Sequence, residues 1–145
     1  MTQDGFLDAY LALQSRFDLA LAQPARTGNS YADRKFCRQR KWIGGRQTRF
    51  VAIGPLFTVR RDVAPHIVPF DESSSVGWGY DFVWSLIAES VGACIGIIDA
   101  APVAHSLRGQ ASASGSQAAG HAMQAYLAWH RHVSKEQAFT VLQTF

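Results

Sequence analysis

Residues 80–99, YDFVWSLIAESVGACIGIID, decide the fold because they place a helical pattern directly before a buried strand. Tyr80, Trp84 and Ile87 recur at helical spacing, which predicts a helix from Tyr80 to Val91. The run ACIGIID that follows is almost entirely apolar and predicts a buried strand that ends at Asp99. A helix followed by a buried strand is typical of the α/β class.

The chain upstream of this unit repeats the alternation of helix and strand. Apolar spacing predicts a helix over Gln3–Phe17, and the following DLALAQP predicts a short strand that Pro24 stops. Residues 25–47 are polar and basic and are expected to form a loop or a short hairpin. The run RFVAIGPLFTV, 49–59, predicts two short strands or one bent strand, and a brief helix is expected around 61–66.

The chain downstream differs in composition. The run GQASASGSQAAG, 109–120, is small and polar and predicts a flexible linker, which would separate a domain over 1–108 from a tail over 121–145. Within the tail, AMQAYLAWHRH predicts a helix. Ser134 and Gln137 have the spacing of a capping box, in which each side chain accepts a backbone N–H of the other.

Composition limits the class of protein. With 145 residues, 48% of them hydrophobic, the chain is long enough for one domain with a core. Cys37 and Cys94 lie far apart and form no CxxC pair, so a reducing compartment, the cytoplasm, is expected. The N-terminus has no signal-peptide pattern and no apolar run is long enough to cross a bilayer, so we expect no transmembrane segment.

A basic segment over 34–49 carries much of the positive charge and is interleaved with aromatic residues. Three interpretations are open: a solvated loop face, an anion-binding surface for phosphate or lipid headgroups, and a nucleic-acid footprint. No known nucleic-acid module accompanies the segment, so no specific nucleic acid is expected. The cations of the segment and its continuation are Arg34, Lys35, Arg38, Arg40, Lys41, Arg46, Arg49, Arg60 and Arg61.

Three titratable residues lie at the ends of predicted core elements. Asp81 follows the glycine-rich GWG at 77–79, where it either interacts with the helix dipole or serves a site. Asp99 and His105 follow the predicted strand, at the kind of edge where α/β sheets bind ligands. A carboxylate with an imidazole can transfer protons or bind a hard divalent ion.

Four blocks of the sequence resemble, in order, the later half of a family of glycosyltransferase-like proteins catalogued as a domain of unknown function. The blocks are FLDAYLALQSRFDLALAQPA, RFVAIGPLF, GWGYDFVW and IGIIDAAPVAHSLR. That family is similar to the GT-A nucleotide-sugar transferases. The resemblance covers roughly residues 6–108 and implies part of a GT-A-like, Rossmann-like mixed sheet flanked by helices, with a helical tail beyond it.

The resemblance also implies roles for individual residues. Asp81 matches the general base of sugar transfer, and Trp78, Gly77 and Gly79 match its acceptor side. His105 matches a ligand of Mn²⁺ or Mg²⁺ on the donor diphosphate, with Asp99 as its support. Weak phosphate contacts are expected from two arginines, Arg108 and Arg49.

The sequence also departs from the family pattern. The Asp-x-Asp metal motif and the first strands of a GT-A sheet precede the region that this chain matches, and Ala52 stands where the family has a glutamate. We therefore expect a truncated glycosyltransferase-like protein, inactive as given, with an unknown acceptor and with a homodimer left open. The alternative is a non-catalytic protein that binds acidic ligands or nucleic acid through 34–49.

Overall fold

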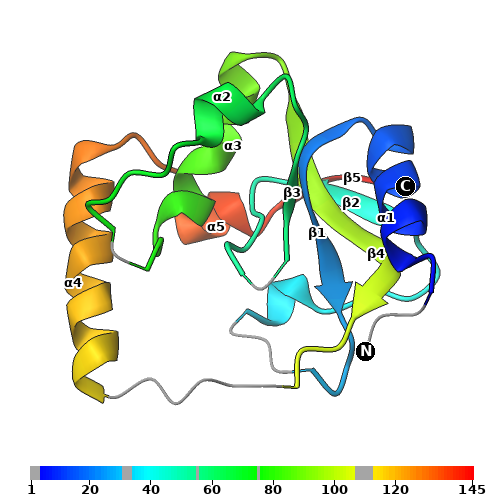
Figure 1. Ribbon diagram of the computed structural model, residues 1–145, viewed down its shortest axis with the longest axis horizontal. Helices are drawn as coiled ribbons and strands as arrows, with labels where there is room; N and C mark the ends of the chain where they lie inside the picture. Colours follow the sequence, from blue (N-terminus) through cyan, green and yellow to red (C-terminus); the bar gives the residue numbers. More distant parts are fainter. Residues whose placement is uncertain (1–3, 31–33, 55, 75, 107–112) are drawn as a thin grey trace.

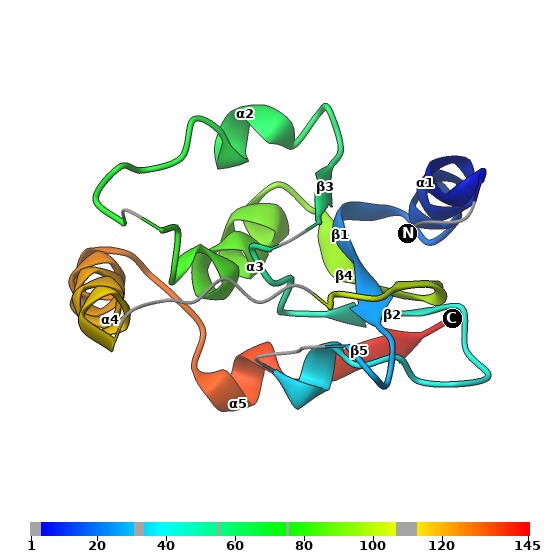
Figure 2. The same ribbon diagram turned by 60° about the horizontal axis from the view of Figure 1, so that its bottom comes forward.

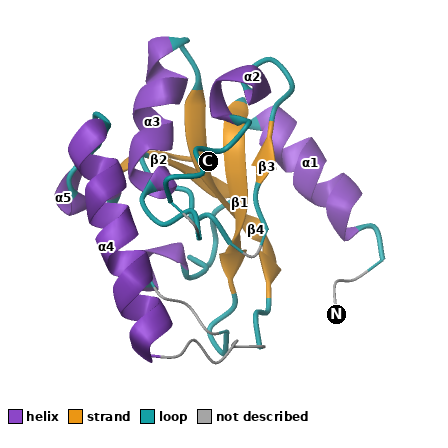
Figure 3. Ribbon diagram, turned by 60° about the vertical axis from the view of Figure 1, so that its left-hand side comes forward, coloured by secondary structure: helices purple, strands orange, loops and turns teal. Residues whose placement is uncertain are grey.

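The computed structural model describes residues 4–30, 34–54, 56–74, 76–106 and 113–145, without the side chains of 113–116. Five strands form one mixed sheet in the order β3-β1-β4-β2-β5. Helix α1 lies on one side of this sheet, and α3 and α4 lie on the other (Figures 1 and 3). The predicted α/β class, with a mixed sheet flanked by helices, is confirmed.

The two central strands, β1 (Leu19–Arg26) and β4 (Cys94–Val103), run parallel. Every residue of β1 is buried, as expected for a strand covered on both faces. The prediction that Pro24 stops this strand is wrong. Edge strand β3 pairs only with Leu21 and Ala22, so the missing N–H of Pro24 breaks no described hydrogen bond to β3. Strand β4 likewise continues past Asp99, and its Val103 pairs with Arg26.

The three outer strands are short and antiparallel to their neighbours. Strand β3 (Thr58–Val59) pairs with β1, β2 (Gly45–Thr48) pairs with β4, and β5 (Val141–Thr144) pairs with β2. Strand β2 therefore lies partly within 25–47, which was expected to be a loop or a short hairpin and also contains the 3₁₀ helix η1 (Lys35–Cys37). Among the described residues of 49–59, only Thr58 and Val59 form a strand, β3.

The predicted helices before the two central strands are confirmed. Helix α1 (Phe6–Arg16) buries Tyr10 and Gln14, and the Gln14 amide donates to the Leu19 carbonyl (3.0 Å). Helix α3 (Tyr80–Ser90) buries most of its side chains between the sheet and the C-terminal elements. The brief helix expected around 61–66 is α2 (Ala64–Ile67). No helix in the described part of the chain has the length and apolar character needed to cross a membrane.

The C-terminal region packs against the rest of the molecule, because Tyr126, Val133 and Ala138 belong to core clusters that also contain residues of α3. Figure 2 shows the course of this part of the chain. Helix α4 (Ala113–Trp129) begins inside the stretch expected to be a linker, where alanines favour helix. The capping box is confirmed at α5 (Lys135–Ala138), where the Ser134 N–H donates to the Gln137 side-chain oxygen (2.9 Å) and the Gln137 N–H donates to the Ser134 hydroxyl (3.2 Å). The tail is not helical to its end, since β5 joins the sheet.

Candidate functional site

A tight turn before α3 positions the predicted acid. Gly77 and Gly79 have φ of 72° and 105°, a region that side chains disfavour. A Cβ on Gly77 would lie 2.1 Å from Cδ1 of Ile53, so the end of the Ile53 side chain would have to move to accept a larger residue there. The Ser74 hydroxyl donates to the Trp78 carbonyl (2.9 Å) and fixes the turn. Asp81 is thereby held in the first turn of α3.

Asp81 faces a cavity of about 930 Å³. Its walls come from β1, the segments around η1 and 50–54, the turn before α3, the loop after β4, and α4. Four predicted site residues meet here, although they come from two separate parts of the sequence: Trp78, Gly79, Asp81 and His105. Trp78 is 41% exposed, so its ring is available to a ligand.

Burial makes the Asp81 carboxyl unusual. Desolvation raises its pKa to about 6, although the Arg34 guanidinium and backbone groups at the start of α3 act in the opposite direction. Its Oδ1 is buried and has no hydrogen-bond partner among the described residues. A carboxyl with a pKa near neutrality can both accept and release a proton, which suits general acid–base chemistry. The interaction with the helix dipole is also present, but desolvation outweighs it.

Basic side chains share the cavity with this carboxyl. Arg26, which is only 4% exposed, lines the cavity together with Arg34, Lys135 and His105. Asp81 is the only acidic residue among the described residues that line it. The cavity therefore favours a ligand that carries negative charge, with one carboxylate placed to act on a hydroxyl.

His105 lies in the loop after β4, where its backbone N–H donates to the Ser30 hydroxyl (2.5 Å). Within the described ranges, no three His, Cys, Asp or Glu side chains gather into a group able to hold a metal ion. The expected binding of Mn²⁺ or Mg²⁺ on the donor diphosphate therefore stays a prediction. The role of His105 as a ligand stays a prediction.

Asp99 belongs to a buried ion pair. Its carboxylate receives Nε and Nη2 of Arg46 at 2.8 and 3.1 Å and the backbone N–H of Arg40 at 2.7 Å. Arg46 also donates to the carbonyls of Phe36 and Arg38, each at 3.0 Å. Both charged side chains are fully buried. This network fastens the segment after η1 to β4, and the oxygens of Asp99 contact Arg46 and Arg40 rather than the cavity.

The cations of the basic segment 34–49 have different surroundings in the structure. Arg34 faces the cavity, Arg46 is buried with Asp99, and Arg49 pairs with Glu89 (2.8 Å) near the end of α3. Arg49 is thus not among the residues that line the cavity, and Arg108 lies outside the described residues. The segment does not form one continuous basic face.

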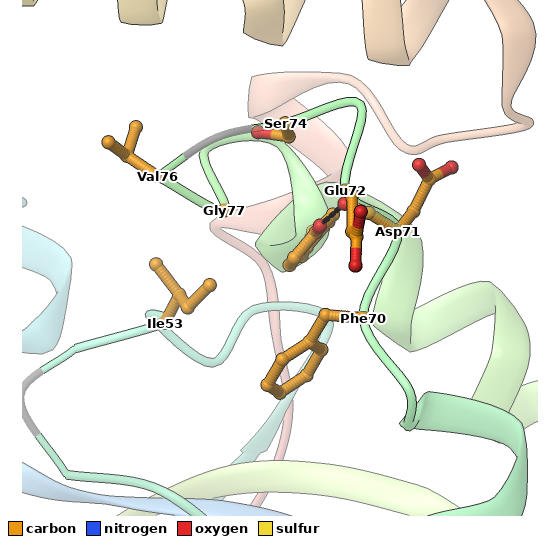
Figure 4. A pocket seen from close by; sticks show the side chains of 8 residues that line it. Ile53, Phe70, Asp71, Glu72, Ser74, Val76 and Gly77 are labelled. Atoms are coloured by element: carbon orange, nitrogen blue, oxygen red, sulfur yellow. Dashed lines mark hydrogen bonds between the residues drawn. The ribbon is translucent and has the colours of Figure 1, made fainter.

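A second cavity of about 460 Å³ adjoins the first, since Ile53 and Val76 line both. Figure 4 shows these two residues on one side and the carboxylates of Asp71 and Glu72 on the other, with Phe70 below. Gly77, predicted on the acceptor side, lines this smaller cavity. Basic residues line the larger cavity, and two acidic residues line its smaller neighbour.

Cys37 also lines the larger cavity but is only 3% exposed. Burial raises the pKa of its thiol, and the Asp81 carboxylate raises it further, while Gln23, Arg26 and Arg46 lower it. The thiol is therefore neutral at physiological pH, which argues against a nucleophilic role.

Several lining residues were not found from the sequence. Arg26 ends β1 and was included in no predicted motif, and Lys135 lies far along the chain, between the two residues of the capping box. Met123 and Gln124 come from α4. No local pattern marks these residues, because tertiary packing alone brings them to the cavity.

Comparison with known proteins adds no assignment: no family model, no curated protein and no solved structure matches this chain.

Proposed function

We propose that this chain carries the acceptor side of a GT-A-like glycosyltransferase site, with Asp81 as the base that activates an acceptor hydroxyl. One observation supports this most strongly. The Asp81 carboxyl, with a pKa raised to about 6 and an unpartnered Oδ1 among the described residues, lines a cavity beside the exposed ring of Trp78. The order of the four sequence blocks agrees with this proposal.

The chemistry assigns a role to each group. An aromatic face packs against the C–H groups of a sugar ring, so Trp78 would hold the acceptor next to Asp81. As the acceptor oxygen forms a bond to the anomeric carbon, its proton passes to the Asp81 carboxylate. The bond from that carbon to the donor diphosphate breaks, and the nucleoside diphosphate leaves with the electron pair. Arg26, Arg34 and Lys135 would stabilise the negative charge that develops on it.

The second cavity provides room for a longer acceptor. It continues from Ile53 and Val76 and presents the Phe70 ring together with two carboxylates. Aromatic rings with carboxylate acceptors suit a polyhydroxylated chain, because the ring packs on C–H groups while the oxygens accept hydroxyl protons. We therefore propose that the acceptor is larger than one sugar unit.

The proposal is tested by saccharide binding to the chain itself. Saturation-transfer NMR with a library of mono- and oligosaccharides is expected to find oligosaccharides that contact the protein. Trp78→Ala should abolish this contact, whereas Trp129→Ala should leave it intact because Trp129 is 89% exposed and does not line either cavity. Saccharide binding that is insensitive to Trp78→Ala, or absent across the library, would contradict the proposed acceptor site.

A second candidate is binding of an anionic ligand without catalysis, which the cations around the cavity favour. Calorimetric titration with nucleoside diphosphates and inorganic diphosphate separates the two. Tight binding of these anions, lost in Arg34→Gln, together with no saccharide binding, would favour the non-catalytic protein. Binding of both ligand classes would favour sugar transfer.

A further inference from the structure

Trp42 adopts a backbone conformation that is unusual for its residue type. Its φ is 70°, in the left-handed region where a bulky side chain is disfavoured. Its side chain is 98% exposed, so packing within the described chain does not stabilise this arrangement. Glycine or asparagine would suit the backbone better. An exposed aromatic residue with a strained backbone indicates a binding role, because the fold itself gains nothing from the strain.

The backbone on both sides of Trp42 is firmly held. On one side, Arg40 donates its N–H to the buried Asp99 (2.7 Å). On the other, Gly44 donates to the Phe145 carbonyl (2.7 Å), and its own carbonyl accepts from Asp99 and Ala100 at 3.0 and 2.9 Å. The segment leading into β2 projects beyond the sheet on the side where the C-terminus lies (Figure 2). Trp42 is therefore presented outward from a fixed support.

Two exposed cations accompany the ring. Arg40 and Lys41 directly precede Trp42, and neither forms an ion pair with any described residue. Arg38 is also exposed, although its guanidinium donates to the Gly28 carbonyl (3.0 Å). A ring with an apolar body and a polar N–H, next to basic side chains, matches the interface of an anionic bilayer.

We infer that the loop 40–43 docks this protein on an anionic lipid surface, with Trp42 entering the headgroup region and Arg40 and Lys41 contacting the lipid phosphates. Charge complementarity and a single apolar anchor support a lipid surface over nucleic acid. A single-strand binder stacks several bases, and the other aromatic residues of the segment are occupied. Phe50 is fully buried, and Phe36 packs against Phe139 with ring centroids 5.3 Å apart. This surface is independent of the proposed sugar-transfer site.

The test is co-sedimentation of the whole chain with phospholipid vesicles. Binding is expected to vesicles with roughly 30% phosphatidylglycerol but not to pure phosphatidylcholine, and to weaken strongly in 0.5 M salt. Arg40→Gln and Lys41→Gln should each lower the partition coefficient about fivefold. Trp42→Ala should lower binding at least as much. The matched control is Trp129→Ala, which changes another strongly exposed tryptophan, 89% exposed, and should bind like the wild type.

A second variant separates binding from folding. Trp42→Gly suits the local backbone, so its melting temperature should equal or exceed that of the wild type while vesicle binding is lost. Unchanged binding in Trp42→Gly, equal binding to neutral and anionic vesicles, or tighter binding to a single-stranded oligonucleotide through the same residues would overturn the inference.

Discussion

Replacement of Asp81 by asparagine tests whether desolvation or the helix dipole dominates at this carboxyl. The side chain keeps its size in Asp81→Asn and loses its charge. If the dipole dominates, the variant should be less stable by roughly 0.3–1 kcal/mol. If desolvation dominates, removal of the buried charge should stabilise the protein, and we expect this result.

The magnitude follows from proton linkage. Burial raises the pKa of Asp81 to about 6 from an ordinary value of 3.8. The native state therefore binds this proton more tightly than the unfolded state, so stability falls as the pH rises from below 4 to above 6. The gap corresponds to about 3 kcal/mol. Asp81→Asn should match the wild type in acid and exceed it by up to about 3 kcal/mol at pH 7.5, or by roughly 6–12 °C in melting temperature.

The assay is urea unfolding of both proteins at several pH values between 3.5 and 7.5. Other carboxyls titrate in this range, but they cancel in the difference between variant and wild type. Asp8→Asn is a matched control, because Asp8 is an exposed acid in the first turn of α1, another 11-residue helix that begins after a left-handed glycine without a side-chain cap. A pH-independent difference at Asp81, or a loss of stability like that expected for Asp8→Asn, would refute the reasoning.

Three further substitutions have predictable effects on the free energy of unfolding, measured with urea. Arg46→Met leaves the fully buried Asp99 carboxylate without its partner and should cost about 3–5 kcal/mol, whereas the double variant Arg46→Met/Asp99→Leu should recover much of this; a loss below 1 kcal/mol in the single variant would contradict the role of the pair. Gly77→Ala should cost about 1–2 kcal/mol for its left-handed φ, while the end of the Ile53 side chain moves away from the new Cβ; wild-type stability would show that the turn rearranges freely. Ser134→Ala removes one bond of the capping box and should cost about 1 kcal/mol, and no measurable loss would mean that α5 is held by packing alone.

Sequence periodicity predicted the helices before the two central strands because each pattern is long and each helix packs apolar side chains against the core. Helix α3 begins at Tyr80, as its pattern indicates. The short strands could not be predicted in the same way. Strand β3 has only two residues, too few for a recognisable pattern. Strand β5 forms because it pairs with β2, and the sequence of residues 141–144 does not indicate this pairing. The ends of β1 and β4 were misjudged because pairing partners, rather than Pro24 or Asp99, set them.

In the site too, features that depend on neighbouring residues could be predicted, and features that depend on residues distant in sequence could not. Asp81 could be selected because an acid among glycines and aromatic residues is uncommon in a buried element. The burial of its Oδ1 depends on residues from several elements, so its raised pKa could not be predicted. Arg46 and Asp99 lie far apart in sequence, and nothing local indicated that the last acid of ACIGIID would be paired with a member of the basic segment.

The parallel pairing of β1 and β4 has a consequence for how this protein folds and unfolds. Leu21 lies opposite Ile95, so the best-buried pair of strands joins two distant parts of the chain. Contacts of this kind form late and slow the folding rate, since a long loop must close before they are made. An N-terminal fragment that ends before α3 would leave β1 without β4 and should not fold. In hydrogen exchange, the central amides of both strands should exchange through global unfolding and give the same free energy of opening.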